Sequence, residues 1–266
     1  MLLISEDKMT KDLTYRDNPQ LYEEVEDIPG EKAMFSRAAE IITGYAKKHP
    51  HGISVLDLCC GTGPIIEYLP ADSPRPLFKS ITGVDISKKY LDFASNKYFY
   101  LPTFGYMHGL ELNFVQADAV EYTHPERVDL VLASSAYHHI EDERKVSFLN
   151  KIHEQLKDNG IVVFCENLIG DYNNLEARAK SVTNFYMKRI EEMKEMRITD
   201  RRLDLVKRVL QYELDREYEW KHPYRIFMEN LRETGFEIVS EEKVWPSVKM
   251  FDDEKVGDFV IVAKKK

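Results

Sequence analysis

The chain has 266 residues, 43% of them hydrophobic and 31% charged, which is ordinary for one large globular domain or one domain with an insertion. Its formal net charge of -9 at pH 7 argues against a general nucleic-acid binder, because such a protein needs a basic surface to neutralise phosphates. Neither a secretory signal nor a membrane-spanning apolar run is visible, so we expect a cytoplasmic protein that binds neither nucleic acid nor membranes.

A helix and then a strand with a glycine turn are predicted near the start of the chain. Residues 31–48 carry apolar side chains at a spacing close to 3.6 residues, which indicates a helix packed against the core. A predicted strand at residues 55–58 runs into small residues that include Gly61 and Gly63, followed by a helical pattern at residues 65–69. Such a turn lets backbone approach a ligand and offers unpaired N–H groups, as in sites for adenosine-bearing ligands.

The next predicted strands end in acidic residues. Asp85 ends the strand at residues 81–84 and would lie beside the glycine turn, where it could accept hydrogen bonds from two ribose hydroxyls. Asp118 ends the strand at residues 112–117 and is either a ligand-binding acid or a turn residue. Two further strands are predicted at residues 128–135 and 161–165.

A helical insertion follows the fifth predicted strand. Residues 171–222 contain two amphipathic segments, with mixed charges on their outer faces. The remaining residues predict a helix and two strands that complete the sheet. We therefore expect N-terminal helices and a ligand-binding core at residues 1–170, a helical lid at 171–222 and the completion of the core sheet at 223–266.

The cysteines give no indication of a metal site. Cys59, Cys60 and Cys165 fall on or beside predicted core strands, and no Cys-x-x-Cys spacing occurs. An odd number of cysteines at buried positions is typical of a reducing compartment, where they act as small apolar side chains. We expect no bound metal.

The order of these motifs resembles that of the class I S-adenosylmethionine-dependent methyltransferases. The family signature opens with an acid and alternating glycines, and residues 57–64 read Asp-Leu-Cys-Cys-Gly-Thr-Gly-Pro. Gly61 and Gly63 match two glycine positions, and Cys59 is a small substitute at the first. The resemblance implies an α/β fold: a Rossmann-like, seven-stranded, mainly parallel sheet flanked by helices, with a terminal antiparallel hairpin and a helical lid insertion.

A nicotinamide-binding Rossmann domain is the rival interpretation. Its fingerprint needs a third glycine, but Ile66 stands at that position and would hinder close packing of helix and strand. Asp57, the acid in the first strand, also has no part in a nicotinamide site. Both features disfavour this interpretation.

The resemblance implies S-adenosylmethionine as the cofactor and places its parts along the strand ends. The glycine turn would border the homocysteine part, with Asp57 near its amino group. Asp85 would bind the ribose, and Asp118 the adenine amino group. Tyr22 either closes over the cofactor or only packs against the first helix. The implied cofactor site consists of Tyr22, Asp57, Cys59, Gly61, Gly63, Asp85, Ile86, Asp118, Ala119 and Ser134.

Catalysis is expected just after the fourth strand, at residues 134–140. Ligands in open α/β sheets bind at the carboxyl ends of strands, and the family's acceptor usually faces the methyl group here. We predict that Tyr137 and His138 are catalytic residues that line the pocket. We predict a structural role for His139, on the argument that adjacent side chains cannot both face one cleft.

Two further residues are candidates for substrate binding. Glu166 follows the fifth strand and could bind a cationic acceptor or cap a backbone turn. Tyr186 lies in the insertion, which could roof the acceptor pocket, form a homodimer contact, or both. The resemblance predicts a transferase that moves a methyl group to a small-molecule acceptor by in-line displacement.

Two other functions stay open. Residues 144–152 and the insertion loosely resemble carboxy-S-adenosylmethionine synthases, so the enzyme could modify or cyclise the cofactor itself. A non-catalytic cofactor-binding module is the third alternative. Gly61, Gly63 and Asp85 weigh against it, because a scaffold would not need them.

Overall fold

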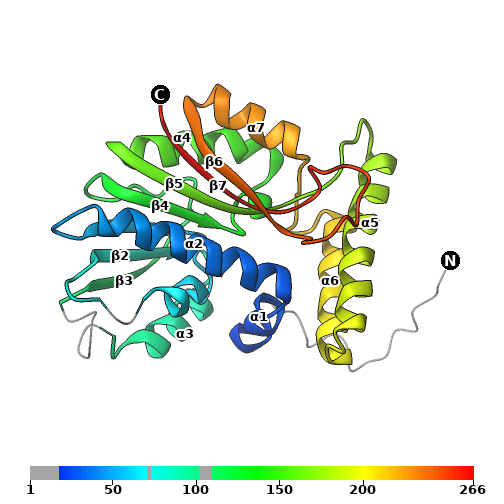
Figure 1. Cartoon of the computed structure of the whole chain (residues 1–266), viewed down its shortest axis with the longest axis horizontal. Helices are drawn as coiled ribbons and strands as arrows, with labels where there is room; N and C mark the ends of the chain where they lie inside the picture. Colours follow the sequence, from blue (N-terminus) through cyan, green and yellow to red (C-terminus); the bar gives the residue numbers. More distant parts are fainter. Residues whose placement is uncertain (1–17, 71–72, 102–108) are drawn as a thin grey trace.

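The computed structural model describes residues 18–70, 73–101 and 109–266, which form a seven-stranded sheet between layers of helices (Figure 1). The strand order is β3-β2-β1-β4-β5-β7-β6, and β7 alone runs antiparallel to its neighbours. This confirms the predicted Rossmann-like sheet with its terminal antiparallel hairpin. The strands are β1 (Ile53–Leu58), β2 (Phe78–Asp85), β3 (Glu111–Gln116), β4 (Val128–Ser134), β5 (Leu156–Leu168), β6 (Phe236–Trp245) and β7 (Gly257–Lys265).

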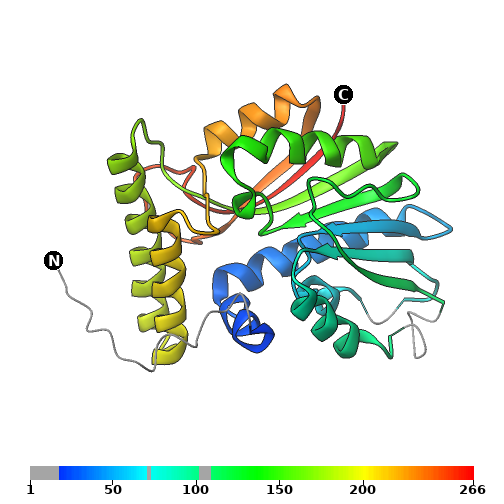
Figure 2. The ribbon, with the colours of Figure 1, turned by 180° about the vertical axis from the view of Figure 1, so that it is seen from behind.

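Helices bury both faces of the sheet. In β4, Leu130 and Leu132 join the apolar cluster on one face, while Val131 and Ala133 join the cluster on the other, because successive strand residues face opposite sides. Figure 2 views the molecule from behind and so shows the second of these two faces. The first face is covered by α2 (Pro29–Lys47) and α3 (Lys88–Tyr98), and the second by α4 (Lys145–Gln155) and α7 (Tyr224–Glu233).

The insertion forms a helical hairpin at one end of the sheet (Figure 1). Its helices α5 (Leu175–Glu195) and α6 (Asp200–Asp215) pack together and on α1 (Pro19–Glu26) through a third apolar cluster. Helix α6 ends at Asp215, and Arg216 and Tyr218 beyond it adopt φ angles of 55° and 70°, which a helix does not allow. None of the helices in the described ranges combines the length and the apolar character that crossing a membrane requires.

The glycine turn after β1 leads into a short 3-10 helix, η3 (Pro64–Tyr68), where the sequence pattern suggests a helical segment. Pro64 takes the first helical position, where its missing N–H costs little. Gly63 precedes it with a φ of 74°, in the left-handed region that favours glycine. The carboxyl ends of parallel strands meet at one edge of a sheet, so this turn lies beside the ends of β2 and β4.

Candidate active site

Asp85 connects the end of β2 to the glycine turn. The parallel register pairs Leu58 of β1 with Val84 of β2, which brings the next residue beside the turn. Asp85 Oδ2 accepts a hydrogen bond of 2.9 Å from the backbone N–H of Gly61, and Oδ1 accepts one of 2.8 Å from Ser87. The structure therefore brings together the two motifs that the sequence analysis linked.

The rest of the turn is held by backbone and core contacts. Cys59 and Gly61 have φ angles of 60° and 55°. The carbonyl oxygen of Gly63 accepts a hydrogen bond of 3.0 Å from the hydroxyl of Tyr98. Asp57 is buried within β1, and burial, with the nearby carboxylate at the end of β2, raises the pKa of its side chain.

Helix α1 places Tyr22 against the glycine turn. A side-chain carbon added at Gly61 would lie 2.7 Å from the Tyr22 hydroxyl oxygen, so glycine fits beneath the ring where a larger residue would collide. The same ring packs against Tyr90 of α3, with the ring centroids 4.8 Å apart. Tyr22 thus lies over the turn and packs against α3, and its closure over the cofactor stays a prediction.

The edge beyond the turn suits an adenosine group. Ile86 is 71% exposed although it is large and apolar, and it directly follows Asp85. An apolar surface next to a carboxylate can contact an adenine ring while the carboxylate accepts hydrogen bonds from ribose hydroxyls. With glycine at position 61 as well, the residues present fit S-adenosylmethionine.

The remaining predicted cofactor residues lie at the same edge. Asp118 Oδ1 accepts a hydrogen bond of 2.9 Å from the N–H of Val120, while Oδ2 pairs with Arg144 at 2.8 Å. An adenine amino group would therefore share this carboxylate with the guanidinium. Ala119 is buried, and Ser134 is the last residue of β4.

Replacing Asp85 with alanine should weaken S-adenosylmethionine binding about ten- to hundredfold, because charge-assisted hydrogen bonds to the ribose are lost. Titration calorimetry on the folded variant measures this loss. Asp92→Ala, which removes an exposed carboxylate from α3, is the matched control and should bind normally. Unchanged affinity in a folded Asp85→Ala protein would remove Asp85 from the cofactor site.

After β4 the chain turns through a short 3-10 helix, η5 (Tyr137–His139), which brings His138 against Glu166 of β5. His138 is buried, and its Nδ1 lies 2.7 Å from Glu166 Oε2. The other carboxylate oxygen accepts hydrogen bonds from the N–H groups of Ala136 and Tyr137, at 3.1 and 2.7 Å. When Nδ1–H donates to the carboxylate, Nε2 keeps its lone pair and can accept a proton.

Burial favours the uncharged form of each member of this pair. It lowers the pKa of His138 well below its usual value and raises the pKa of Glu166 to about 7. A neutral imidazole is the form that can act as a general base. Of the two roles considered for Glu166, the structure shows the contacts of a turn cap, and the same carboxylate orients His138.

Tyr137 lies in the core, contrary to the prediction that it lines the pocket. Its side chain is 1% exposed and packs edge-on against Phe227 of α7, with the ring centroids 4.7 Å apart. Its hydroxyl oxygen accepts a hydrogen bond of 2.7 Å from Asn230 Nδ2. The turn directs this ring into the apolar layer beneath α7, so we do not retain Tyr137 as a catalytic candidate.

His139 lines the same cavity as His138, so the argument that neighbouring side chains must separate is wrong here. Neighbours point to opposite faces in a strand, but these two residues belong to a 3-10 turn, and their ring centroids are 4.4 Å apart. His139 Nδ1 also lies 2.9 Å from the carbonyl oxygen of Tyr218. This contact ties the turn to the chain segment after α6.

A cavity of about 40 Å³, here called the inner cavity, lies between the strand ends, α1 and the lid. Ser135, His138 and Asn167 approach it from the ends of β4 and β5. Tyr186, the predicted substrate-binding residue, lines it from α5. Tyr22 lines it from α1 and therefore links the inner cavity to the glycine turn.

A buried charge cluster that the sequence analysis missed lies beside the inner cavity. Arg189 of α5 donates to Glu31 at 3.0 Å and pairs with Asp258 of β7. Asn167 Nδ2 donates to both carboxylates, at 3.1 and 2.8 Å. The one available signal was an arginine within the apolar face of α5, next to residues such as Ile190.

A second buried cluster joins α5 and α6 to the segment that follows α6. Lys221 Nζ lies 2.6 Å from Glu219 Oε2 and 3.6 Å from Glu213 Oε2. Glu213 also pairs with Arg178 of α5. These charges are mutually paired, which is what burial of ionised side chains requires.

Three potential metal ligands also meet at the inner cavity, although the cysteine pattern predicts no metal site. One ligand atom each from His138, His139 and Glu219 lie within 4.8 Å of one another. His139 is already bonded to the Tyr218 carbonyl, and Glu219 to Lys221. These bonds would have to rearrange for an ion to bind.

Comparison with known proteins agrees with this geometry. Residues 55–160 match the family model described as a methyltransferase domain. An uncharacterized methyltransferase of Schizosaccharomyces pombe is 35% identical over 112 residues, which is 41% of this chain and 37% of that protein, so the chain spans less than half of this relative. A carboxy-S-adenosyl-L-methionine synthase of Nitratiruptor sp. is 23% identical over 197 residues, 74% of each chain.

The fold is shared with solved structures. A crystal structure of an S-adenosylmethionine-dependent methyltransferase from Clostridium acetobutylicum is 14% identical with a TM-score of 0.59, covering 94% of this chain and 98% of that one. At this identity the likeness concerns the fold.

Sheet, glycine turn and family match together define an enzyme domain that binds an adenosine-bearing cofactor. Residues 55–160 form a methyltransferase domain of the class I S-adenosylmethionine-dependent type, and S-adenosylmethionine is the cofactor of such domains.

Proposed function

We propose that the protein transfers a methyl group from S-adenosylmethionine to a small-molecule acceptor bound in the inner cavity. One observation carries this proposal: His138, oriented by Glu166, lines a cavity that Tyr22 connects to the glycine turn. In this proposal, the proton acceptor His138 and the cofactor lie on opposite sides of the inner cavity. The narrow cavity and its position beneath the lid favour a small acceptor over a macromolecule.

The reaction needs little machinery beyond alignment. The bound cofactor supplies an already activated methyl group, so much of the rate can come from holding the acceptor atom in line with the methyl carbon and the sulfur. The acceptor's lone pair forms the new bond to the methyl carbon as the carbon–sulfur bond breaks, and that bond's electron pair stays on sulfur. His138 Nε2 accepts the proton that the acceptor releases.

The lid contributes much of the wall around the acceptor. Tyr186, Arg189 and Lys221 line the inner cavity from residues 171–222, and α1 closes the space between lid and glycine turn. We infer that this lid excludes water from the transferred methyl group. A homodimer contact through the outer surface of the lid is compatible with this role.

An enzyme that alters the cofactor itself is the second candidate. The likeness to a carboxy-S-adenosyl-L-methionine synthase over 74% of both chains favours it. The two reactions leave different products. Methyl transfer converts the cofactor to S-adenosylhomocysteine, whereas cyclisation yields methylthioadenosine and carboxylation yields a carboxylated sulfonium.

Mass spectrometry of the cofactor decides between these reactions. We expect S-adenosylhomocysteine after incubation with a small-molecule extract, together with an acceptor heavier by one methyl group. A cofactor labelled with deuterium in its methyl group identifies that acceptor. A carboxylated sulfonium or methylthioadenosine as the main enzyme-dependent product would overturn methyl transfer.

A further inference from the structure

Glu26 is a buried carboxylate with an unused hydrogen-bonding atom. It is the last residue of α1 and is 9% exposed. Its Oε2 atom is buried and has no hydrogen-bond partner within the described ranges, and the nearby Tyr22 hydroxyl only partly offsets the effect of burial on the carboxyl pKa. Burying an unpaired carboxylate is costly, so its place at the wall of the inner cavity points to a ligand that supplies the missing charge.

The cationic side chains near Glu26 already form ion pairs with other acids. Arg189 is shared by Glu31 and Asp258, and Lys221 pairs with Glu219. The negative charge of Glu31 adds to the unfavourable negative potential at Glu26. Burial and the Glu31 carboxylate together raise the pKa of Glu26.

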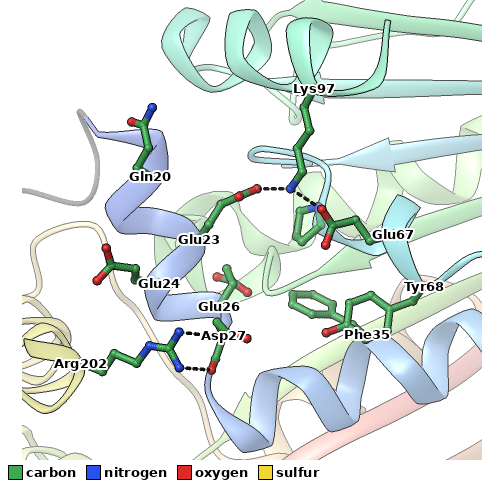
Figure 3. Close-up of a pocket in the computed structure, with 11 residues that line it drawn as sticks. Gln20, Glu23, Glu24, Glu26, Asp27, Phe35, Glu67, Tyr68, Lys97 and Arg202 are labelled. Atoms are coloured by element: carbon green, nitrogen blue, oxygen red, sulfur yellow. Dashed lines mark hydrogen bonds and ion pairs between the residues drawn. The ribbon is translucent and has the colours of Figure 1, made fainter. Parts of the chain in front are cut away.

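A second cavity leads to Glu26 from outside. This outer cavity, of about 350 Å³, lies between α1, η3, α3 and the start of α6 (Figure 3). Its acids are Glu23, Glu24, Glu26, Asp27 and Glu67, and its cations are Lys97 and Arg202. Figure 3 shows Lys97 held between Glu23 and Glu67, and Arg202 against Asp27. Arg201 also pairs with Glu24, and Lys32 with Asp27. Within the described ranges, Glu26 is therefore the acid of this set without a paired cation, and its charge attracts small cations.

Glu26 lines both cavities and so lies where the outer one approaches the inner one. We propose that the acceptor carries a protonated amine, which enters past the acids of α1 and pairs with the Glu26 carboxylate in the inner cavity. This inference rests on the proposed methyl transfer for the identity of the ligand as an acceptor. An ammonium group offers three donors and can therefore bond Oε2 and neighbouring oxygen atoms together.

The Glu26→Gln variant distinguishes an effect on amine binding from an effect on folding. Glutamine keeps the shape of the side chain and an oxygen that can accept a hydrogen bond, but it cannot be ionised. Because glutamine needs no counter-charge in the buried site, the melting temperature should stay the same or rise, whereas binding of an ammonium group, which favours the ionised carboxylate, should fall. Glu40→Gln is the matched control, since it removes an exposed carboxylate of α2 that pairs with Arg37.

The binding test uses ethylammonium chloride, with ethanol as the neutral probe of similar size. Ligand-observed NMR is recorded on protein saturated with S-adenosylhomocysteine, so that the cofactor site is filled. We expect ethylammonium to bind at least about tenfold more weakly to Glu26→Gln than to the parent protein or Glu40→Gln. We expect ethanol to bind none of the three measurably.

Three results would overturn the assignment. They are absence of ethylammonium binding to the parent protein, equal ethylammonium binding by the parent and Glu26→Gln, and a Glu26→Gln protein that loses only S-adenosylmethionine affinity. The last result would assign the carboxylate to the cofactor's own positive charge.

Turnover distinguishes this inference from the proposed function. A small-molecule extract is divided by cation exchange, and label transfer from the methyl-labelled cofactor is followed in the retained and unretained fractions. Transfer confined to the retained fraction, and lost in Glu26→Gln, supports both conclusions. Ethylammonium binding without any methyl transfer would overturn the proposed function alone, and transfer only to unretained molecules would overturn the amine assignment alone.

Discussion

Replacing Arg189 with alanine is expected to lower the free energy of unfolding by about 3–5 kcal/mol, because breaking a buried ion pair leaves its partner charges uncompensated. Glu31 and Asp258 would both remain buried without a counter-charge. The variant would also lose the packing of the guanidinium over the Trp245 ring, whose centroid lies 4.4 Å away. Urea denaturation followed by circular dichroism measures the change.

The matched control is Arg37→Ala, because Arg37 pairs with Glu40 and Glu242 at the surface. Exposed ion pairs contribute about 0–1 kcal/mol, so this variant should unfold almost normally. Adding Asp258→Asn to Arg189→Ala should recover part of the loss, since one uncompensated charge disappears. Equal effects of Arg37→Ala and Arg189→Ala would show that the buried cluster does not hold the lid to the core.

Replacing His138 with alanine is expected to lower kcat by about 10²–10⁴-fold, because the acceptor's proton loses its general base. The dependence of kcat on pH in the parent enzyme should also report this general base. Burial lowers the pKa of His138, and the base acts only when unprotonated, so protonation of the imidazole should reduce kcat only below the ordinary histidine value of about 6.5. A smaller decrease near pH 7 should accompany protonation of Glu166, which orients the imidazole. Steady-state kinetics with an identified acceptor, across this pH range, measures both effects.

His51→Ala controls for loss of a histidine, since His51 is exposed on the loop before β1. Glu166→Gln should lower kcat less than His138→Ala, because the imidazole stays in place but its orientation and charge balance weaken. A folded His138→Ala protein with full activity would contradict the general-base role. Catalysis would then rest on alignment alone.

The cofactor half of the candidate site is predictable from the sequence because its signals are local. Gly61 and Asp85 each stand at the end of a short apolar run, and parallel strands bring their carboxyl ends to one edge. The acceptor half is not predictable in this way. Tyr137 and His138 are adjacent, and only the 3-10 turn sends the first into the core and the second to the inner cavity.

By itself, the sequence determined the order of the strands and helices, because periodicity and turn residues report local burial. The seven-stranded sheet and the cofactor followed from the resemblance of the motifs to a known family. The tertiary structure alone decided which charges meet at the inner cavity. Glu26, Glu31, Arg189 and Asp258 come from α1, α2, α5 and β7, elements far apart in the chain. The spacing of residues along a chain does not encode which distant side chains will pair. That pairing depends on how helices and sheet pack, and here it leaves Glu26 as the carboxylate open to a ligand.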